Sequence, residues 1–169
     1  MHPLADAGGL VSTTIQLTQG KVAVIDDEDA ERCAKHKWFA VKTARLWYAQ
    51  TRIGPRHVYL HRFLFSHLGE RLDHINGDGL DNRQENIRAA SHRQNMANRR
   101  KPQWRDGRQT ASRFKGVYRN GTRWQARIEQ NDKSVYLGSF EREEDAGMAY
   151  NQAALERFGA FARMNEIAI

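Results

Sequence analysis

The sequence predicts an α+β protein in which two small modules are joined by a basic linker. Short runs of alternating apolar and polar residues, separated by Gly-containing turns, are typical of antiparallel strands. Residues 141–158 combine an acidic first turn with a stripe of small apolar side chains, which is typical of a helix. Residues 98–111 place Arg and Lys side chains around one Pro and one Gly, so they separate a module at 13–97 from a module at 112–166.

Composition and charge limit the classes of function that the chain can have. The chain has 169 residues, enough for one ordinary domain or two small ones. Its 27 Lys and Arg against 20 Asp and Glu give a net charge of +7, which favours a polyanionic partner. Cys33 is the single cysteine, which excludes an intrachain disulfide and a multi-cysteine zinc site. There is no apolar run of about 18 residues and no signal-like start, so we expect a soluble, intracellular protein without membrane contact.

The first module is predicted to be an aromatic-rich β structure after a loose lead-in at residues 1–12. Trp38, Trp47 and Tyr48 are expected in its core, with base stacking as the alternative role. His61 stands on a mostly apolar element, which favours a hydrogen-bonded structural histidine over a ligand. The expected elements are strands near 15–17 and 22–25, a helix from the acidic residues 26–29 to about 36, strands at 38–41 and 46–49 around a turn at 42–45, and a strand and helix within 58–65.

A polar stretch in the middle of the chain carries its most specific chemical pattern. Asp73 and His74 are adjacent, so on an extended segment one side chain is free to bind metal while the other faces a substrate. Two Gly-containing turns follow and favour a tight reversal. Residues 84–99 contain neither Gly nor Pro and predict a helix, with Asp81 or Asn82 as its cap.

The donor set of this stretch suits a hard divalent cation. Asn95 is expected to project from the predicted helix back toward Asp73. Carboxylate and amide oxygens are ligands that Mg²⁺ or Mn²⁺ accepts while it keeps positions for water and phosphate. A neutral His74 can take a proton from water near neutral pH. The alternative is a polar hairpin whose Asp and Asn side chains only satisfy turn amides.

Asp73-His74, Asn86 and Asn95 together resemble the HNH motif of phage and intron homing endonucleases, in which a strand hairpin and a helix hold one metal ion. The resemblance implies that Asp73 and Asn95 are metal ligands and that His74 is the general base. It also implies that Asn86 braces the loop and orients that base. The last position is Asn where the name of the motif has a second His, a substitution familiar in the homing subgroup. His92, one turn earlier, is the alternative ligand.

The second module is predicted to be three short strands and a helix. Strands near 114–118, 124–129 and 135–137 are separated by turns at Asn120-Gly121 and Asn131-Asp132. A helix over 141–158 follows and ends at Gly159. Alternation gives the middle strand a core face and a solvent face, with Trp124, Ala126 and Ile128 opposed to Gln125, Arg127 and Glu129.

The segments SRFKGVYRNGTRWQARI and VYLGSFEREEDAGMAYNQAALERFGAFARMN closely resemble the AP-two or ethylene-response-factor DNA-binding domain. The resemblance implies that the sheet lies in the DNA major groove with the helix behind it. The target sequence of the plant domains is not transferred, because several contact positions differ here. The implied core is Trp124, Val117, Leu137, Phe140, Ala149 and Tyr150, and the implied DNA contacts are Lys115, Tyr118, Arg119, Arg123, Gln125, Arg127, Glu129, Ser134 and Tyr136.

The linker adds a further set of basic side chains, which includes Arg99, Arg100, Lys101 and Arg105. An extended cationic segment can follow a DNA backbone or enter a minor groove. The alternative is a solvated charge run without a partner.

These expectations combine into a site-specific DNA endonuclease of the HNH homing type. It would use one divalent ion, Mg²⁺ or Mn²⁺, and would act on double-stranded DNA inside a bacterial host cell, as a phage protein does. The chain offers no coiled-coil pattern and no exposed apolar stripe for a dimer, so a monomer is expected. The alternative is a transcription regulator that keeps the nuclease fold without activity. An RNA-binding or structural role is disfavoured, because the major groove of RNA is too narrow for a sheet.

Overall fold

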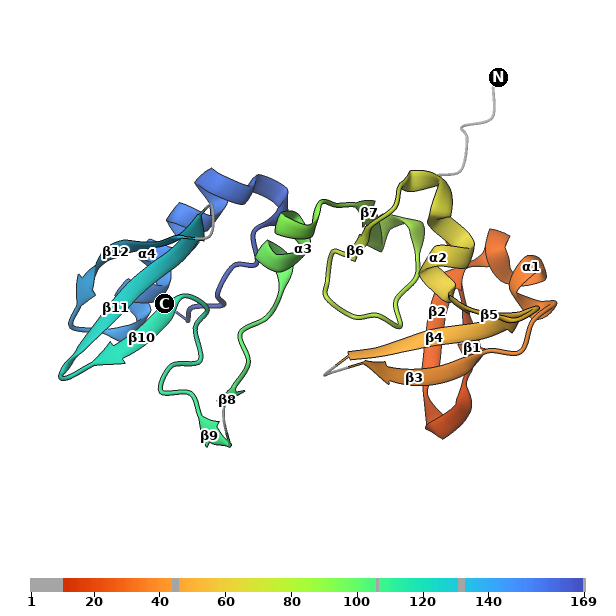
Figure 1. The fold of residues 1–169 in the computed structure, drawn as a ribbon, viewed down its shortest axis with the longest axis horizontal. Helices are drawn as coiled ribbons and strands as arrows, with labels where there is room; N and C mark the ends of the chain where they lie inside the picture. Colours follow the sequence, from red (N-terminus) through yellow and green to blue (C-terminus); the bar gives the residue numbers. More distant parts are fainter. Residues whose placement is uncertain (1–10, 44–45, 106, 131–132, 169) are drawn as a thin grey trace, which may run out of the picture. The chain divides into compact units, whose positions relative to one another are not determined.

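The computed structural model describes residues 11–43, 46–105, 107–130 and 133–168, and the chain divides into two compact units, Met1–Ala90 and Ser91–Ile169. Figure 1 labels the elements of each unit. The described residues form several small antiparallel sheets and a few helices, which confirms a mixed α and β protein. No helix in these ranges is long and apolar enough to cross a membrane. The lead-in before residue 11, residues 44–45 of the predicted turn at 42–45 and the whole predicted turn at 131–132 lie outside the described residues.

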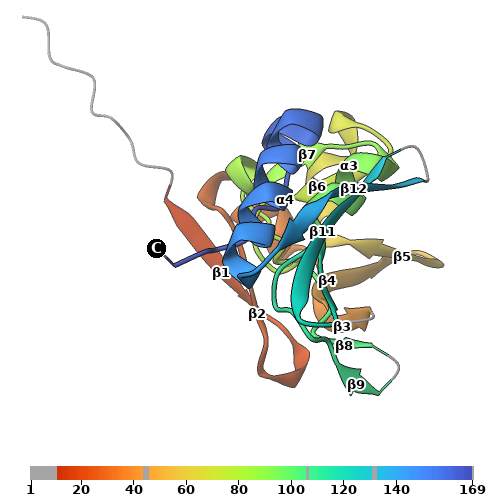
Figure 2. The same cartoon turned by 90° about the vertical axis from the view of Figure 1, so that its left-hand side faces the viewer.

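The first unit opens with a hairpin and continues with a three-stranded meander, as the apolar alternation predicts. Figure 2 shows the hairpin of β1 and β2, and Figure 1 shows α2 beside the meander. Short helical turns at Thr18–Gly20, Asp27–Asp29 and Ser66–Leu68 connect the elements. The elements are β1 (Ser12–Gln16), β2 (Val22–Asp26), α1 (Ala30–Ala34), β3 (Phe39–Thr43), β4 (Leu46–Ile53), β5 (Arg56–Tyr59) and α2 (Leu60–Phe65).

Aromatic and aliphatic side chains from these elements form one core. Trp38 is 4% exposed and donates its indole N–H to the carbonyl of Cys33 at 2.9 Å. A buried Trp whose N–H is satisfied contributes apolar burial without a polar penalty. The core role of Trp38 is thus confirmed. Trp47 is half-buried against the same core, whose buried members are Leu17, Ala23, Ile25, Cys33, Trp38, Ala40, Ala49, Leu60, Leu64, Phe65 and Ile87.

The segment after Asp73 differs from the predicted helix. Strand β6 (Leu72–His74) pairs antiparallel with β7 (Ile87–Ala89), and Gln84–Asn86 is a 3-10 turn. The prediction of a continuous helix over 84–99 is therefore wrong. Pairing with β6 and burial of Ile87 in the core hold residues 87–89 extended, so tertiary contacts override local helix propensity.

Helix α3 spans only His92–Asn98. Ser91 accepts a hydrogen bond from the Gln94 amide at 3.2 Å, and the Gln94 side chain accepts one from the Ser91 amide at 2.7 Å. This reciprocal capping box satisfies amides that a helix start otherwise leaves unpaired. The predicted cap at Asp81 or Asn82 is wrong, because the short turn after them is capped by the Asp26 carboxylate, which accepts from the Gln84 amide at 2.7 Å.

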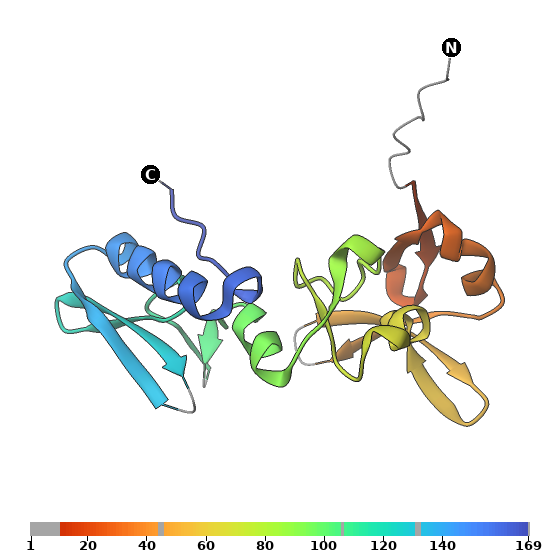
Figure 3. The same cartoon turned by 90° about the horizontal axis from the view of Figure 1, so that it is seen from above.

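The second unit contains the predicted three-stranded sheet and its helix. The sheet has the order β10–β11–β12, and Figure 3 shows α4 along one face of it. The first strand begins three residues later than the predicted start at 114, and Gly159 ends α4 as predicted. The elements are β10 (Val117–Asn120), β11 (Arg123–Gln130), β12 (Lys133–Phe140), α4 (Glu143–Phe158) and a 3-10 turn at Gly159–Phe161.

The core of the second unit lies between this sheet and α4. Small residues on α4, such as Ala146, Ala153 and Ala154, allow the helix backbone to approach the sheet closely. The predicted core residues are confirmed, since Val117 and Tyr150 are buried and the others pack against the core as half-buried side chains: Trp124, Leu137, Phe140 and Ala149.

Residues 98–111 are more structured than an extended linker. Strands β8 (Trp104–Arg105) and β9 (Arg108–Gln109) form a short hairpin, and the Thr110 amide donates to the Gln103 carbonyl at 2.8 Å. The backbone hydrogen bonds of the hairpin explain why the chain reverses here instead of remaining extended.

Candidate functional site

Asp73 and His74 lie next to each other on β6, and both are 8% exposed. Arg88 on β7 donates from Nε and Nη2 to Oδ2 of Asp73 at 3.0 and 2.8 Å. A buried carboxylate needs such charge compensation, because desolvation of an unpaired charge is costly. Arg88 was not predicted as a site residue. Its contact with Asp73 follows from the register of β6 and β7, in which the two residues are paired. The sequence predicted a helix at Arg88, so this pairing was not expected.

The loop between β6 and β7, residues 75–86, is held by the side chain of Asn86. Its Oδ1 accepts from the Asn76 amide at 2.9 Å, and its Nδ2 donates to the Asp81 carbonyl at 2.7 Å. The Ile75 amide donates to the Asn86 carbonyl at 2.9 Å. Because these bonds join the two ends of the loop to its middle, Asn86 fixes the loop conformation.

The middle of this loop is also tied to the first hairpin. The Asn82 amide donates to the Val24 carbonyl at 2.7 Å, and the Val24 amide donates to the Leu80 carbonyl at 2.9 Å. Asp81 accepts from Arg83 Nε and Nη2, both at 2.8 Å. The hydrogen bond to Arg83 is the main cause that lowers the pKa of the Asp81 carboxyl. The loop is therefore fixed at both ends and at its centre.

Gly79 brings the loop against β4. A Cβ at this position would lie 2.5 Å from Cε1 of Tyr48, closer than real Cβ contacts allow. Only glycine therefore fits this approach. The same Tyr48 ring also borders His74, with ring centroids 5.9 Å apart.

Aromatic rings surround the His74 side chain. The His61 ring meets it edge to face with centroids 5.1 Å apart, and Tyr59 stacks on His61 at 5.5 Å. Asn82, which is fully buried, places Oδ1 3.5 Å from His74 Nε2. Burial lowers the pKa of His74, while the bond to Asn82 and nearby carboxylates oppose that shift. A lowered pKa keeps the imidazole neutral, the form that accepts a proton.

His61 lies directly beside His74 in the candidate site. Burial and then the neighbouring His74 lower its pKa to about 3. Its Nδ1 is buried and finds no hydrogen-bond partner in the part of the chain that the structure describes. Its half-buried position agrees with the expected structural role, whereas the expected hydrogen bond is not found for Nδ1. Asn82 and Tyr48 are residues beside His74 that sequence reasoning did not assign to the site.

The donor chemistry near Asp73 fits a hard divalent ion. The described residues contain no group of three or more His, Cys, Asp or Glu side chains suited to a metal. Mg²⁺ binds through one or two carboxylate or amide oxygens and keeps several waters, so a small donor set does not conflict with it. Asp73 supplies a buried carboxylate, and its partner Arg88 compensates the charge of that group.

Asn95 and His92 belong to α3 and therefore to the second unit, whereas Asp73 and His74 belong to the first. Lys115 fastens α3 within the second unit, because its Nζ donates to the carbonyls of Met96 and Ala97 at the end of the helix. Cations favour the C-terminal end of a helix, where unpaired carbonyls gather.

Two of the predicted DNA contacts thus have partners inside the protein. Burial lowers the pKa of Lys115 to about 8. Lys101 donates Nζ to the Val117 carbonyl at 2.6 Å and lies 5.3 Å from the centre of the Tyr118 ring. Burial likewise lowers the pKa of Lys101 to about 8. Both lysines therefore donate to backbone carbonyls of the second unit in this structure.

The sheet presents a polar face on the side opposite α4. Directly paired residues share a face, and the pairs Tyr118↔Gln125, Arg127↔Tyr136 and Glu129↔Ser134 lie on this one. Tyr118 and Tyr136 are 49% and 56% exposed. Arg123 pairs with Asn120 on the same face. Arg119 pairs with Trp124 and lies 4.7 Å from its ring centre, and it also borders the hollow on the polar face.

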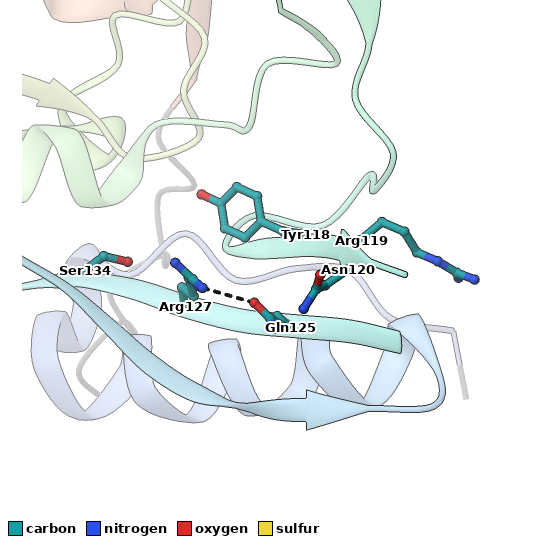
Figure 4. Close-up of a pocket in the computed structure, with 6 residues that line it drawn as sticks. All are labelled: Tyr118, Arg119, Asn120, Gln125, Arg127 and Ser134. Carbon is teal, nitrogen blue, oxygen red and sulfur yellow. Dashed lines mark hydrogen bonds between the residues drawn. The ribbon is translucent and has the colours of Figure 1, made fainter. Parts of the chain in front are cut away.

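This polar face is slightly hollowed. Figure 4 shows the lining side chains, with Arg127 donating Nη2 to Oε1 of Gln125 at 3.1 Å. The hollow has a volume of about 420 Å³ and is lined by Tyr118, Arg119, Asn120, Gln125, Arg127 and Ser134. Its donors and acceptors are the kinds that read base edges and phosphates.

Positive charge is concentrated in the second unit. Residues 91–169 contain 15 Lys and Arg against 9 Asp and Glu, whereas residues 1–90 contain 12 against 11. The resulting charges are +6 and +1. The second unit therefore carries most of the attraction to a polyanion.

Comparisons with known proteins relate the site to one class of nuclease. Residues 68–97 match a family model described as HNH endonuclease. The chain is 29% identical over 142 residues to a protein of Acanthamoeba polyphaga mimivirus named as an uncharacterized HNH endonuclease. That alignment covers 79% of this chain and 69% of the relative, so it includes residues of both units. The family match implies a nuclease, a hydrolase acting on DNA.

Proposed function

We propose that the protein is a site-specific DNA endonuclease of the HNH homing type. The observation that carries the proposal is the buried Asp73-His74 pair on β6, which lies inside the segment that matches the HNH endonuclease family. The fixed loop beside it supports a preorganised site, because catalytic groups act best when their supports do not move.

In this proposal His74 is the general base. It accepts a proton from water, and the resulting hydroxide attacks phosphorus while the bond to the leaving oxygen breaks. Burial among aromatic rings keeps His74 neutral and restricts its rotation. Asn86 acts indirectly, since its hydrogen bonds brace the loop that surrounds the base.

Asp73 and Asn95 are the proposed ligands of Mg²⁺ or Mn²⁺, with His92 as the alternative to Asn95. A bound divalent ion supplies charge stabilisation for the phosphate and the leaving oxygen. The oxygen chemistry of the Asp73 and Asn95 side chains supports this choice.

The second unit is proposed to bind double-stranded DNA as an AP-two-like domain. Its excess of positive charge and the polar face of its sheet support this role. The outer-face residues Tyr118, Arg123, Gln125, Arg127, Glu129, Ser134 and Tyr136 are the proposed contacts. Arg99, Arg100 and Arg105 are proposed to add contacts to the DNA backbone.

A plasmid assay tests the proposal. Supercoiled DNA is incubated with the protein and Mg²⁺, with EDTA, or with the His74→Ala variant. Relaxed or linear product that requires both the metal and His74 supports the nuclease. Asp73→Ala and Asn95→Ala are expected to abolish cleavage while DNA binding persists. DNA that is bound but never cut with any divalent ion favours a transcription regulator instead.

A further inference from the structure

We propose that Asn82 is a positioning residue that fixes the His74 imidazole in the tautomer with its hydrogen on Nε2. The tautomer is a property of the folded protein and does not depend on the proposed function. The expected effect of Asn82 on catalysis does rest on the proposed function.

Asn82 is held rigidly at its backbone. It is 0% exposed, and its amide donates to the Val24 carbonyl at 2.7 Å. The preceding residue, Asp81, is fixed by Arg83 and by the Asn76 side chain, which donates Nδ2 to Oδ2 of Asp81 at 2.8 Å. A side chain on so constrained a backbone has few alternative positions.

The contact between the two side chains defines a proton position. Oδ1 of Asn82 lies 3.5 Å from Nε2 of His74. With Oδ1 turned toward the ring, the Asn82 amide can only accept in this contact, which assigns the hydrogen to Nε2. A neutral imidazole has one N–H, so the lone pair that accepts a proton is then on Nδ1.

Aromatic neighbours limit rotation of the His74 ring. His61 meets it edge to face at 5.1 Å, and Tyr48 does so at 5.9 Å. His61 is itself stacked on Tyr59, with ring planes 14° apart. These rings confine the plane of His74, while Asn82 selects which nitrogen bears hydrogen.

If the Asn82 amide had the opposite orientation, the other tautomer of His74 would be expected. That orientation would turn Nδ2 toward His74 and require the hydrogen on Nδ1. In the orientation described, Nδ2 is buried and has no hydrogen-bond partner among the described residues. Measurement of the tautomer therefore decides between the two orientations.

The test is a long-range ¹H–¹⁵N correlation spectrum of the full-length, ¹⁵N-labelled protein without metal. The signals of His74 are assigned by their loss in His74→Gln. We expect a protonated Nε2 and an unprotonated Nδ1 in the unchanged protein. A protonated Nδ1 overturns the proposal, whatever the variants do.

Two variants test the role of Asn82. Asn82→Asp keeps an acceptor near Nε2 and is expected to keep the hydrogen there, whereas Asn82→Ala is expected to give a mixture of tautomers. In plasmid nicking, Asn82→Ala is expected to lower kcat about tenfold or more with little change in KM, as loss of a supporting hydrogen bond does. An unchanged tautomer in folded Asn82→Ala contradicts the proposal. If no DNA is cut by any form, the nuclease function fails while the tautomer result still stands.

Discussion

Arg88 and Asp73 face each other across the β6–β7 ladder, and Nη2 and Nε of Arg88 donate to Oδ2 of Asp73 at 2.8 and 3.0 Å. The side chains are 16% and 10% exposed. Arg88 therefore compensates the charge of the proposed metal ligand.

Arg88→Met is expected to destabilise the protein. Removal of one partner leaves the Asp73 carboxylate buried without this compensation, at a cost of about 3 kcal/mol. Mg²⁺ is expected to restore part of this stability, because a ligand that binds only the folded state stabilises it. Thermal unfolding with Mg²⁺ or EDTA measures both effects.

The control is Arg32→Met, which removes an ion pair to Asp29 from a side chain that is 45% exposed. Its stability should not respond to Mg²⁺ more than that of the unchanged protein. An equal response of the two variants to Mg²⁺ would contradict the assignment of Asp73 as a ligand.

Gly116→Ala is expected to destabilise the second unit. Gly116 has a φ of +74°, and a Cβ there would collide with the Tyr150 ring and lie 2.6 Å from the Arg127 carbonyl oxygen. Overpacking and the left-handed backbone together should cost about 2–5 kcal/mol. Urea unfolding measures the loss.

Gly121→Ala is the matched control for this prediction. Its φ is +57°, but no atom lies within 4 Å of the added Cβ. Only the backbone cost of about 1 kcal/mol is therefore expected. Equal losses for the two substitutions would show that the close approach of Gly116 to Tyr150 has no energetic effect.

The alternation of apolar and polar residues in the second unit made its sheet predictable from the sequence. Trp124, Ala126 and Ile128 lie toward the core as their period predicts, because apolar alternation and turn residues agree there. The short strand Ile87–Ala89 has no such period, and its pairing with β6 decides its conformation. The sequence contains a signal for the start of α3, because Ser91 and Gln94 have the spacing of a capping box.

The candidate site was predictable only in part. Asp73 and His74 carry a local motif, but the contact of Asn82 with His74 depends on the hydrogen bond between Asn82 and Val24, which are distant in sequence. Lys115 resembles an exposed cation in the sequence, yet α3 supplies carbonyl partners for it. Such long-range contacts leave no periodic signal in the chain.

Cys33 is expected to make stability fall as pH rises through the range from about 9 to about 11. Burial raises the pKa of its thiol from 9.0 to about 11. Between these values the unfolded thiol loses its proton while the folded thiol keeps it, so unfolding is favoured as pH rises. The difference in unfolding free energy between the unchanged protein and Cys33→Ala, measured against pH, isolates this effect. A difference that does not depend on pH would contradict it.

Arg127→Ala is expected to weaken binding to duplex DNA and to lower its salt dependence. Arg127 lies on the exposed sheet face with Tyr136 and is one of the proposed DNA contacts, and we expect its charge to meet a phosphate. Loss of one phosphate contact should reduce the slope of log affinity against log salt by about 0.9. Arg142→Ala removes an exposed arginine at the start of α4 and is the control, with no change in slope expected. Fluorescence anisotropy titrations at several salt concentrations measure the slopes, and equal slopes for both variants would exclude Arg127 from the DNA interface.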